Sequence, residues 1–346
     1  MVRFFLYSFL SSLFLMSCNG DAVSTAPDVT SVPVDLDLVR YDKALMSIDL
    51  SQPRFAYDKM LASHPSLTDL YFKQLLQMYH ADRDTMGARI THFLNDDRIR
   101  NLVKTIDATY PEVDFLDQPL TQALRYYKHY FPEKPTPRFY TLFTEYSYQT
   151  FIFDDVDRDG IGIGLDMFLG DDFDYKAVDP TDPAFSDYLT RTYNEAHLIK
   201  KTIELLAIDA IGEAPGKRFI DKMIHQGKKI YILKKLLPAT PDYILYEYTE
   251  AQMTWMQNNE LSVWDFYLEL NVMYDTNHLK LSKLLSPAPT TQGMPEASPG
   301  RTTEYIGHQI VDAFMKRHPE LTLKDLIAER DYQTILEGAK YKPARK

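Results

Sequence analysis

Cysteine is almost absent from the 346-residue chain, which contains a single one, Cys18. One cysteine excludes an intrachain disulfide and a cysteine-rich zinc site. Positive charge is also scarce, because 38 Lys and Arg residues stand against 49 Asp and Glu residues and leave a formal net charge of -11. Since binding to a phosphate backbone needs a basic face, we expect no nucleic-acid partner. Beyond the first 17 residues, the sequence has no apolar run long enough to span a membrane.

Several catalytic signatures are missing as well. The chain has no His-Glu-x-x-His sequence, no Gly-x-Ser-x-Gly elbow, no phosphate-binding loop and no dinucleotide-binding fingerprint. Lipidation of Cys18 would also remove the thiol that Cys-His catalysis needs. We therefore expect no enzymatic activity, no cofactor and no metal. What remains is ordinary globular composition, with 45% hydrophobic, 13% aromatic and 25% charged residues.

The first residues resemble a secretory leader that ends at a lipidation site. Arg3 supplies the positive charge, and residues 4–16 form an apolar stretch too short for a stable membrane span. The stretch ends in a pattern that resembles a bacterial lipobox, Leu15-Met16-Ser17-Cys18. We predict a lipoprotein signal peptide over 1–17, a lipidated flexible tether over 18–33, and a membrane-anchored lipoprotein of the cell envelope that faces the periplasm. The alternative is a generic signal peptide with a coincidental cysteine.

Hydrophobic periodicity predicts a single, mostly helical domain over 34–346 with a small central β-sheet, an α+β fold. Apolar residues recur at helical spacing in 67–79, 119–130, 199–210, 219–237 and 306–314. The aromatic-rich segment 138–153 indicates two strands. Segment 161–165 alternates apolar residues with glycine, as a strand does where another backbone passes close by. We expect Thr249 and Gln252 to form a capping box, and Thr322 to cap the last helix.

The sharpest short metal motif is Asp155-x-Asp157-x-Asp159-Gly160. It matches the first half of a calcium loop, in which oxygen ligands alternate before a glycine. The twelfth position of such a loop is Asp166, where a bidentate glutamate is usual, and the flanking residues indicate strands where a calcium loop has helices. We favour an acidic hairpin with Asp159-Gly160 as turn residues. A calcium-stabilised binding module remains an alternative.

Two other polar residues raise the question of a ligand. His197 is followed one turn later by Lys201, and a protonated lysine cannot replace a second zinc-binding histidine. We interpret His197 as a histidine on the surface of an amphipathic helix. Gln226 lies on an apolar stripe, where a buried amide must find a hydrogen-bond partner. We expect that its amide is satisfied within the core.

Several segments of the second half are informative through their order and spacing. They are residues 162–170, 221–231, 248–255, 259–260 and 298–311, and the chain closes with Lys340-Tyr341-Lys342-Pro343. Together with the lipobox, they resemble the GldB family of gliding-motility lipoproteins of the Bacteroidetes. The resemblance implies a non-enzymatic envelope protein that supports gliding motility and the associated type IX secretion machinery. Its implied partners are other gliding-motility or secretion envelope proteins, with the membrane contacted through the lipid on Cys18.

That family is distantly similar to predicted zinc peptidases, which implies a degenerate peptidase-like scaffold. In this comparison 162–170 is the edge strand, the helix near 191–211 is the former metal helix, and Gln226 replaces a ligating glutamate. The alternative function is therefore a zinc metallopeptidase with an unrecognised ligand set. Without metal, the former cleft is expected to be a partner-binding groove, and its candidate residues are Asp166, Gln226, Lys228 and Arg301.

Overall fold

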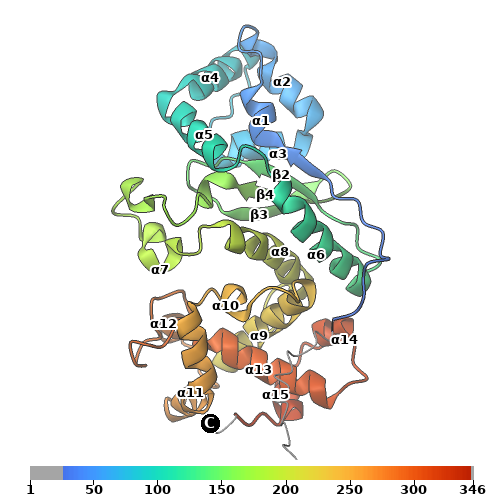
Figure 1. Cartoon of the computed structure of the whole chain (residues 1–346), viewed down its shortest axis with the longest axis vertical. Coiled ribbons are helices and arrows are strands. Elements are labelled where there is room, and N and C mark those ends of the chain that lie inside the picture. Colours follow the sequence, from blue (N-terminus) through green and yellow to red (C-terminus); the bar gives the residue numbers. More distant parts are fainter. Residues whose placement is uncertain (1–25, 344–346) are drawn as a thin grey trace, which may run out of the picture.

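A four-stranded sheet lies in the middle of an elongated molecule, between two groups of helices (Figure 1). The computed structural model describes residues 26–343, so that the predicted leader and Cys18 lie outside the described part. The chain is 57% helical. This confirms the predicted fold class, a mainly α protein with a small central β-sheet.

The sheet has the strand order β1-β2-β4-β3. Its strands are β1 (Leu38–Arg40), β2 (Arg138–Leu142), β3 (Thr150–Asp155) and β4 (Arg158–Gly164). β1, β2 and β4 run parallel, and β3 pairs antiparallel with β4. The three longer strands fall where the sequence predicts strands. β1 was not predicted, because three residues are too short to show an alternating pattern.

The glycines of β4 make room mainly for aromatic rings on the neighbouring strand. A Cβ atom on Gly160 would lie 2.3 Å from the ring of Phe153, and one on Gly162 would lie 2.2 Å from the ring of Phe151. The predicted close backbone occurs only at Gly164, where a Cβ atom would lie 2.2 Å from the carbonyl oxygen of Tyr148. Small residues in β4 therefore let the rings of β3 lie flat across the hairpin.

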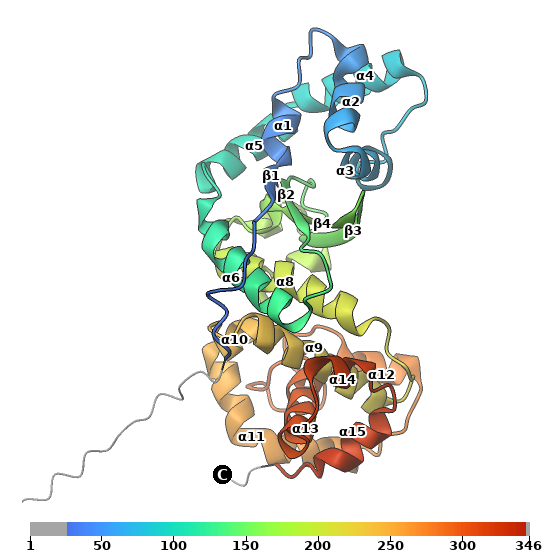
Figure 2. The same cartoon turned by 90° about the vertical axis from the view of Figure 1, so that its right-hand side faces the viewer.

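Helices from the first half of the chain cover one side of the sheet, and two longer helices cover the other (Figures 1 and 2). The predicted helix over 67–79 is shorter than expected, since a helix over 65–70 continues only as a π-helical turn that ends at residue 75. α6 begins two residues before Pro119 and ends at Tyr130, as predicted. The first group is α1 (Tyr41–Met46), α2 (Pro53–Ser63), α3 (Pro65–Leu70), α4 (Arg83–Asn95) and α5 (Asp97–Thr109), and the second is α6 (Asp117–Tyr130) and α8 (Glu195–Ile211).

The helices from α9 onward form the C-terminal half of the molecule (Figure 2). The predicted capping box is present, because Thr249 and Gln252 exchange hydrogen bonds at the start of α11. Thr322 caps α14, whereas the last helix, α15, begins later and is capped by Asp331. These helices are α9 (Phe219–Leu236), α10 (Asp242–Leu245), α11 (Glu250–Glu269), α12 (His278–Leu285), α13 (Thr302–Arg317), α14 (Leu323–Ala328) and α15 (Tyr332–Ala339).

The packed chain begins earlier than the predicted boundary at residue 34. Val29 is only 1% exposed, and Val32 packs against the same hydrophobic core. These side chains hold residues of the predicted flexible tether against the body of the protein, because apolar burial favours the packed state. The part of the predicted tether that precedes residue 26 lies outside the described residues. No helix within 26–343 is long and apolar enough to cross a membrane.

Two glycines allow α9 and α13 to touch through their backbones. A Cβ atom on Gly227 would lie 2.1 Å from the carbonyl carbon of Gly307. One on Gly307 would lie 2.0 Å from the carbonyl oxygen of Met223. Neither position has room for a methyl group, so this crossing requires glycine on both helices.

Gly227→Ala should destabilise the protein although alanine is the better helix former. Forcing a methyl group into a packed contact costs about 1–3 kcal/mol in typical cores, and a clash with backbone cannot be relieved by a side-chain rotation. We expect chemical denaturation to show a loss of that size in the free energy of unfolding. Lys104→Ala on the exposed face of α5 is the control and should leave the free energy almost unchanged. Equal stability of the two variants would contradict the proposed steric constraint.

Candidate functional site

Asp166 is fully buried in the turn that follows β4. Its Oδ2 atom accepts hydrogen bonds from the backbone N–H groups of Thr144 at 3.0 Å and Tyr146 at 2.6 Å. Burial raises the pKa of Asp166 to about 6, although these N–H groups favour the charged form. Glu145 and Tyr146 both have left-handed backbone conformations, with φ of 51° and 60°, which side-chain-bearing residues rarely adopt. Asp166 therefore positions a strained loop between β2 and β3.

Lys228 and Gln226 lie on α9. The Lys228 Nζ atom donates to the carbonyl oxygens of Ile327 at 3.2 Å and Glu329 at 3.1 Å, at the end of α14. It also lies 4.9 Å above the ring of Tyr332. Burial lowers the pKa of Lys228 to about 8. The Oε1 atom of Gln226 is buried and has no hydrogen-bond partner within 26–343, so the expected satisfied amide is not found for this atom.

Arg301 belongs to a buried ion cluster in which α8, α9, the segment after α10 and the first turn of α13 meet. The cluster contains four cations and three carboxylates, all largely withdrawn from solvent. We call these seven residues the ion cluster: Lys200, Lys201, Glu204, Lys229, Glu247, Arg301 and Glu304.

Glu247 is the centre of the ion cluster. Its Oε1 atom lies 2.9 Å from Lys200 Nζ and 3.3 Å from Lys201 Nζ, and its Oε2 atom lies 2.9 Å from Arg301 Nη2. Burial alone would raise the pKa of Glu247, but these three cations hold it well below its ordinary value. Glu247 and Arg301 both have left-handed backbone conformations, with φ of 55° and 56°. Two strained residues are thus joined by a direct ion pair.

Lys229 connects the other two carboxylates of the cluster. Its Nζ atom lies 2.8 Å from Glu204 Oε1 and 3.3 Å from Glu304 Oε1. Lys200 also contacts Glu204, at 2.7 Å. The side chains of three helices are therefore linked, α8 to α9 and α9 to α13. Because breaking one member of a buried pair leaves the other charge desolvated and alone, such a cluster enforces one arrangement of the helices.

The four predicted groove residues do not meet in one place. Asp166 is bonded to the loop after β2, Lys228 to the end of α14, and Arg301 to the ion cluster. Sequence reasoning identified Arg301 but missed the partners that give it a role. A signal was present in Lys200 and Glu204, which lie four residues apart and so share one face of the predicted helix.

The facing sides of α8 and α9, where the comparison with zinc peptidases places a metal, carry ion pairs. His197 is only 6% exposed, so it is not the surface histidine that we expected. Its Nδ1 atom lies 2.8 Å from Asn194 Oδ1, and burial lowers its pKa to about 4. Lys201 pairs with Glu247. Within residues 26–343, no group of three or more His, Cys, Asp or Glu side chains is placed to hold a metal ion.

The acidic motif forms the β3–β4 hairpin, whose turn differs from the predicted one. The turn residues are Val156 and Asp157, and Val156 has a left-handed conformation with φ of 53°. Asp159 and Gly160, predicted as the turn, pair with residues of β3 inside the hairpin. A calcium loop would have to curve around an ion, whereas the residues after the turn continue as the straight strand β4.

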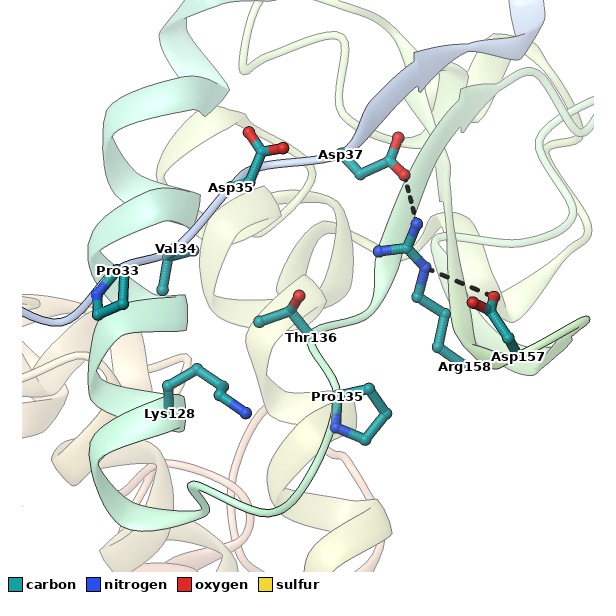
Figure 3. A pocket seen from close by; sticks show the side chains of 9 residues that line it. All are labelled: Pro33, Val34, Asp35, Asp37, Lys128, Pro135, Thr136, Asp157 and Arg158. Carbon is teal, nitrogen blue, oxygen red and sulfur yellow. Dashed lines mark hydrogen bonds and ion pairs between the residues drawn. The ribbon is translucent and has the colours of Figure 1, made fainter.

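The carboxylates near this hairpin are engaged by arginines. Asp155 accepts hydrogen bonds from Tyr140 at 2.7 Å and from Arg138 at 3.1 Å. Figure 3 shows Asp37 and Asp157 on either side of Arg158, at the wall of a hollow of about 460 Å³. Arg158 lies 2.6 Å from Asp37 and 3.9 Å from Asp157. The acidic side chains therefore fasten the N-terminal segment and the hairpin to each other.

Glu247→Gln should destabilise the protein strongly. The substitution keeps the shape of the side chain but leaves the buried amine of Lys201 without its carboxylate, and it removes one of two carboxylate partners from Lys200 and from Arg301. Breaking a buried pair in this way costs about 3–5 kcal/mol, which denaturant unfolding at neutral pH can measure. Glu133→Gln, which removes an exposed partner of Lys324, is the matched control and should have little effect. A Glu247→Gln protein as stable as this control would show that the cluster does not hold the helices.

Acid should weaken the folded state through the same carboxylates. Burial opposes the charge of Glu204, but Lys200 and Lys229 keep its pKa below the ordinary value of 4.5, and Glu247 is shifted the same way. The unfolded chain then binds protons first, so this stabilisation is complete above about pH 4.5 and is lost as the pH falls further. Urea unfolding between pH 7 and 3 should show this fall, with a shallower slope for Glu204→Gln. Parallel curves for the two proteins would contradict the assignment.

Comparison with known proteins identifies the family. The family model described as gliding motility protein GldB matches residues 23–343, which is almost the whole chain. The match includes the residues of the ion cluster and both glycines at the crossing of α9 and α13. No curated protein and no solved structure matches the chain. Since the family model covers far more than half of the sequence, the chain belongs to the family of the gliding motility protein GldB.

Proposed function

We propose that the protein is a lipid-anchored envelope protein that supports gliding motility and the associated type IX secretion machinery by binding other envelope proteins. The observation that carries this proposal is the continuous family match over residues 23–343. A match of this extent includes the packed body of the protein as well as a local motif. This extent supports a proposal that concerns the folded chain as a whole.

The anchor is proposed from the sequence. Cys18 is the only cysteine among 346 residues and stands at the end of the lipobox pattern. Each buried methylene of an acyl chain contributes about 0.8 kcal/mol, and stable anchoring takes more than one chain. A cysteine that carries several acyl chains would keep the body at a membrane surface of the envelope, on the periplasmic side.

A binding role fits the way in which the protein uses its charged residues. The cations and carboxylates of the ion cluster contact one another, and the amine of Lys228 donates to two backbone carbonyls. These groups hold helices together, so none of them is poised as a free nucleophile or base. Recognition of partners then depends on the surface that this framework positions.

Cys18→Ala should abolish lipidation. Cells that express the variant should incorporate no labelled palmitate into the protein, and the protein should leave the membrane fraction or keep an uncut leader. Ser24→Ala, in the predicted tether, is the control and should be labelled and membrane-bound like the wild type. Acyl labelling that persists in Cys18→Ala would contradict the proposed anchor.

Deletion of the gene in the host bacterium tests the proposed role in the cell. Loss of gliding and of type IX secretion, restored by the wild-type gene and not by the Cys18→Ala gene, is the expected result. Cross-linking in the restored strain should join the protein to another envelope protein. A deletion strain that glides and secretes normally would contradict the proposal.

A further inference from the structure

Two adjoining hollows form a groove next to the strained loop that Asp166 positions. The first has a volume of about 610 Å³ and lies between residues 145–149 and residues 178–193. The second, of about 370 Å³, lies against α5. Both are lined by Glu145, Tyr146 and Val178, so that one hollow continues into the other. We call this surface the loop groove; the segment near α7 (Asp187–Thr190) that borders it projects to one side of the sheet (Figure 1).

Aromatic side chains line the first hollow. Its lining includes Tyr146, Tyr148, Phe185 and Tyr193. The buried ring of Tyr175 braces three of them, with ring centroids 6.2 Å from Tyr146, 6.0 Å from Phe185 and 5.0 Å from Tyr193. Aromatic faces of this kind attract ammonium and guanidinium groups. Phe185 and Tyr193 are only 4% and 3% exposed, and Tyr146 stacks on Phe173. Of the four rings, Tyr148, which is 42% exposed, is therefore the one open to a cation with an apolar stem.

Three exposed carboxylates lie at the rim of the same hollow: Glu145, Asp179 and Asp182. None of them forms an ion pair within residues 26–343. Of the nearby cations, Lys176 lies 2.6 Å from Asp187, whereas Arg98, 3.2 Å from Asp96, itself lines the second hollow beside Glu145. At the first hollow the rim thus presents Asp179 and Asp182, two carboxylates without an ion pair among the described residues, beside the exposed ring of Tyr148.

The fold presents this groove in a fixed shape. The carboxylate of Asp166 holds Thr144 and Tyr146 by their N–H groups. On the other side, Lys201 donates to Gln149 Oε1 at 2.8 Å and lies 5.7 Å from the ring centroid of Tyr193. Because Lys201 also contacts Glu247, the ion cluster supports the wall of the groove. A site that is fixed before binding loses less free energy when a ligand is ordered on it.

We propose that the loop groove binds an extended, basic segment of a partner protein. One Lys or Arg side chain of that segment enters the first hollow, between the exposed ring of Tyr148 and the carboxylates of Asp179 and Asp182. An apolar side chain of the same segment lies in the second hollow, against Ile99 and Leu102 of α5. The identification of the partner as an envelope protein rests on the proposed function, whereas the chemistry of recognition rests on the groove alone.

Peptide binding to the purified, full-length lipoprotein in detergent tests the groove. The probes are fluorescent peptides in which Lys or Arg alternates with Val, and matched peptides with Gln or Glu in place of the basic residues. We expect the basic peptides to bind at least about tenfold more tightly than the Gln peptide, which corresponds to about one cation–π contact with one charge pair. The double variant Asp179→Asn, Asp182→Asn should lose about tenfold in affinity for the basic peptides.

Two further variants distinguish a loss of peptide binding at the groove from a loss of folding or of overall negative charge. Tyr148→Leu changes a ring that is 42% exposed, so it should reduce peptide affinity without changing the melting temperature. Asp187→Asn removes an exposed carboxylate of the same segment that pairs with Lys176 outside the groove, and it should bind like the wild type. Equal binding of the Lys and Gln peptides, or wild-type affinity in the double variant, would overturn the proposal. Free arginine methyl ester that binds as tightly as the peptides would overturn it too, by showing a site for small cations.

The peptide experiment tests the groove and the deletion experiment tests the proposed function, so either proposal can be contradicted without the other. Peptide affinity reports on the groove even if the deletion strain glides normally. Conversely, a non-gliding deletion strain supports the proposed function even if no basic peptide binds. Restoring the deletion strain with the double variant joins the two: impaired gliding supports the use of the groove in motility, and normal gliding contradicts that use.

Discussion

The close crossing of α9 and α13 at Gly227 and Gly307 is the constraint on which the C-terminal half depends. Packed helices usually lie 8–10 Å apart, with side chains between them. Here the backbones themselves are in contact, because neither glycine tolerates a Cβ atom. This approach brings Lys229 on α9 within 3.3 Å of Glu304 on α13. The close approach at Gly227 and Gly307 therefore allows charged side chains of α9 and α13 to form part of the ion cluster.

The ion cluster and the loop groove use charge in opposite ways. Within the ion cluster, each carboxylate contacts at least one cation, and the cluster fixes the relative positions of α8, α9 and α13. At the groove, exposed carboxylates remain without an ion pair in the described part of the chain. Lys201 belongs to the first arrangement and supports the second through Gln149. Interior charge thus shapes a surface whose own charge is available to a partner.

Periodicity predicted α6, α8, α9, α13 and the three longer strands, because each depends on residues that are close together in the sequence. It could not predict which helices carry the two ends of an ion pair, since Glu247 and Lys200 are separated by the whole of α9. Asp166 was predicted as a site residue, but its role depends on the left-handed loop at Glu145 and Tyr146. That loop contains no glycine, the residue that ordinarily indicates left-handed backbone in a sequence. The predicted turn at Asp159-Gly160 was wrong for a related reason, because aromatic rings across the hairpin need the glycine inside the strand.

The position of β1 determines how the protein would respond to mechanical load. The strand follows the packed N-terminal segment and pairs in parallel with β2 over three residue pairs. Asp37, just before it, is bonded to Arg138 and Arg158 at 2.7 Å and 2.6 Å. A pull on the N-terminus along the axis of β1 loads these ladder bonds and ion pairs at the same time, in shear, so that they must yield together. Tension applied ahead of residue 26 would first have to free the packed segment that contains Val29 and Val32, and only then would it reach the central sheet.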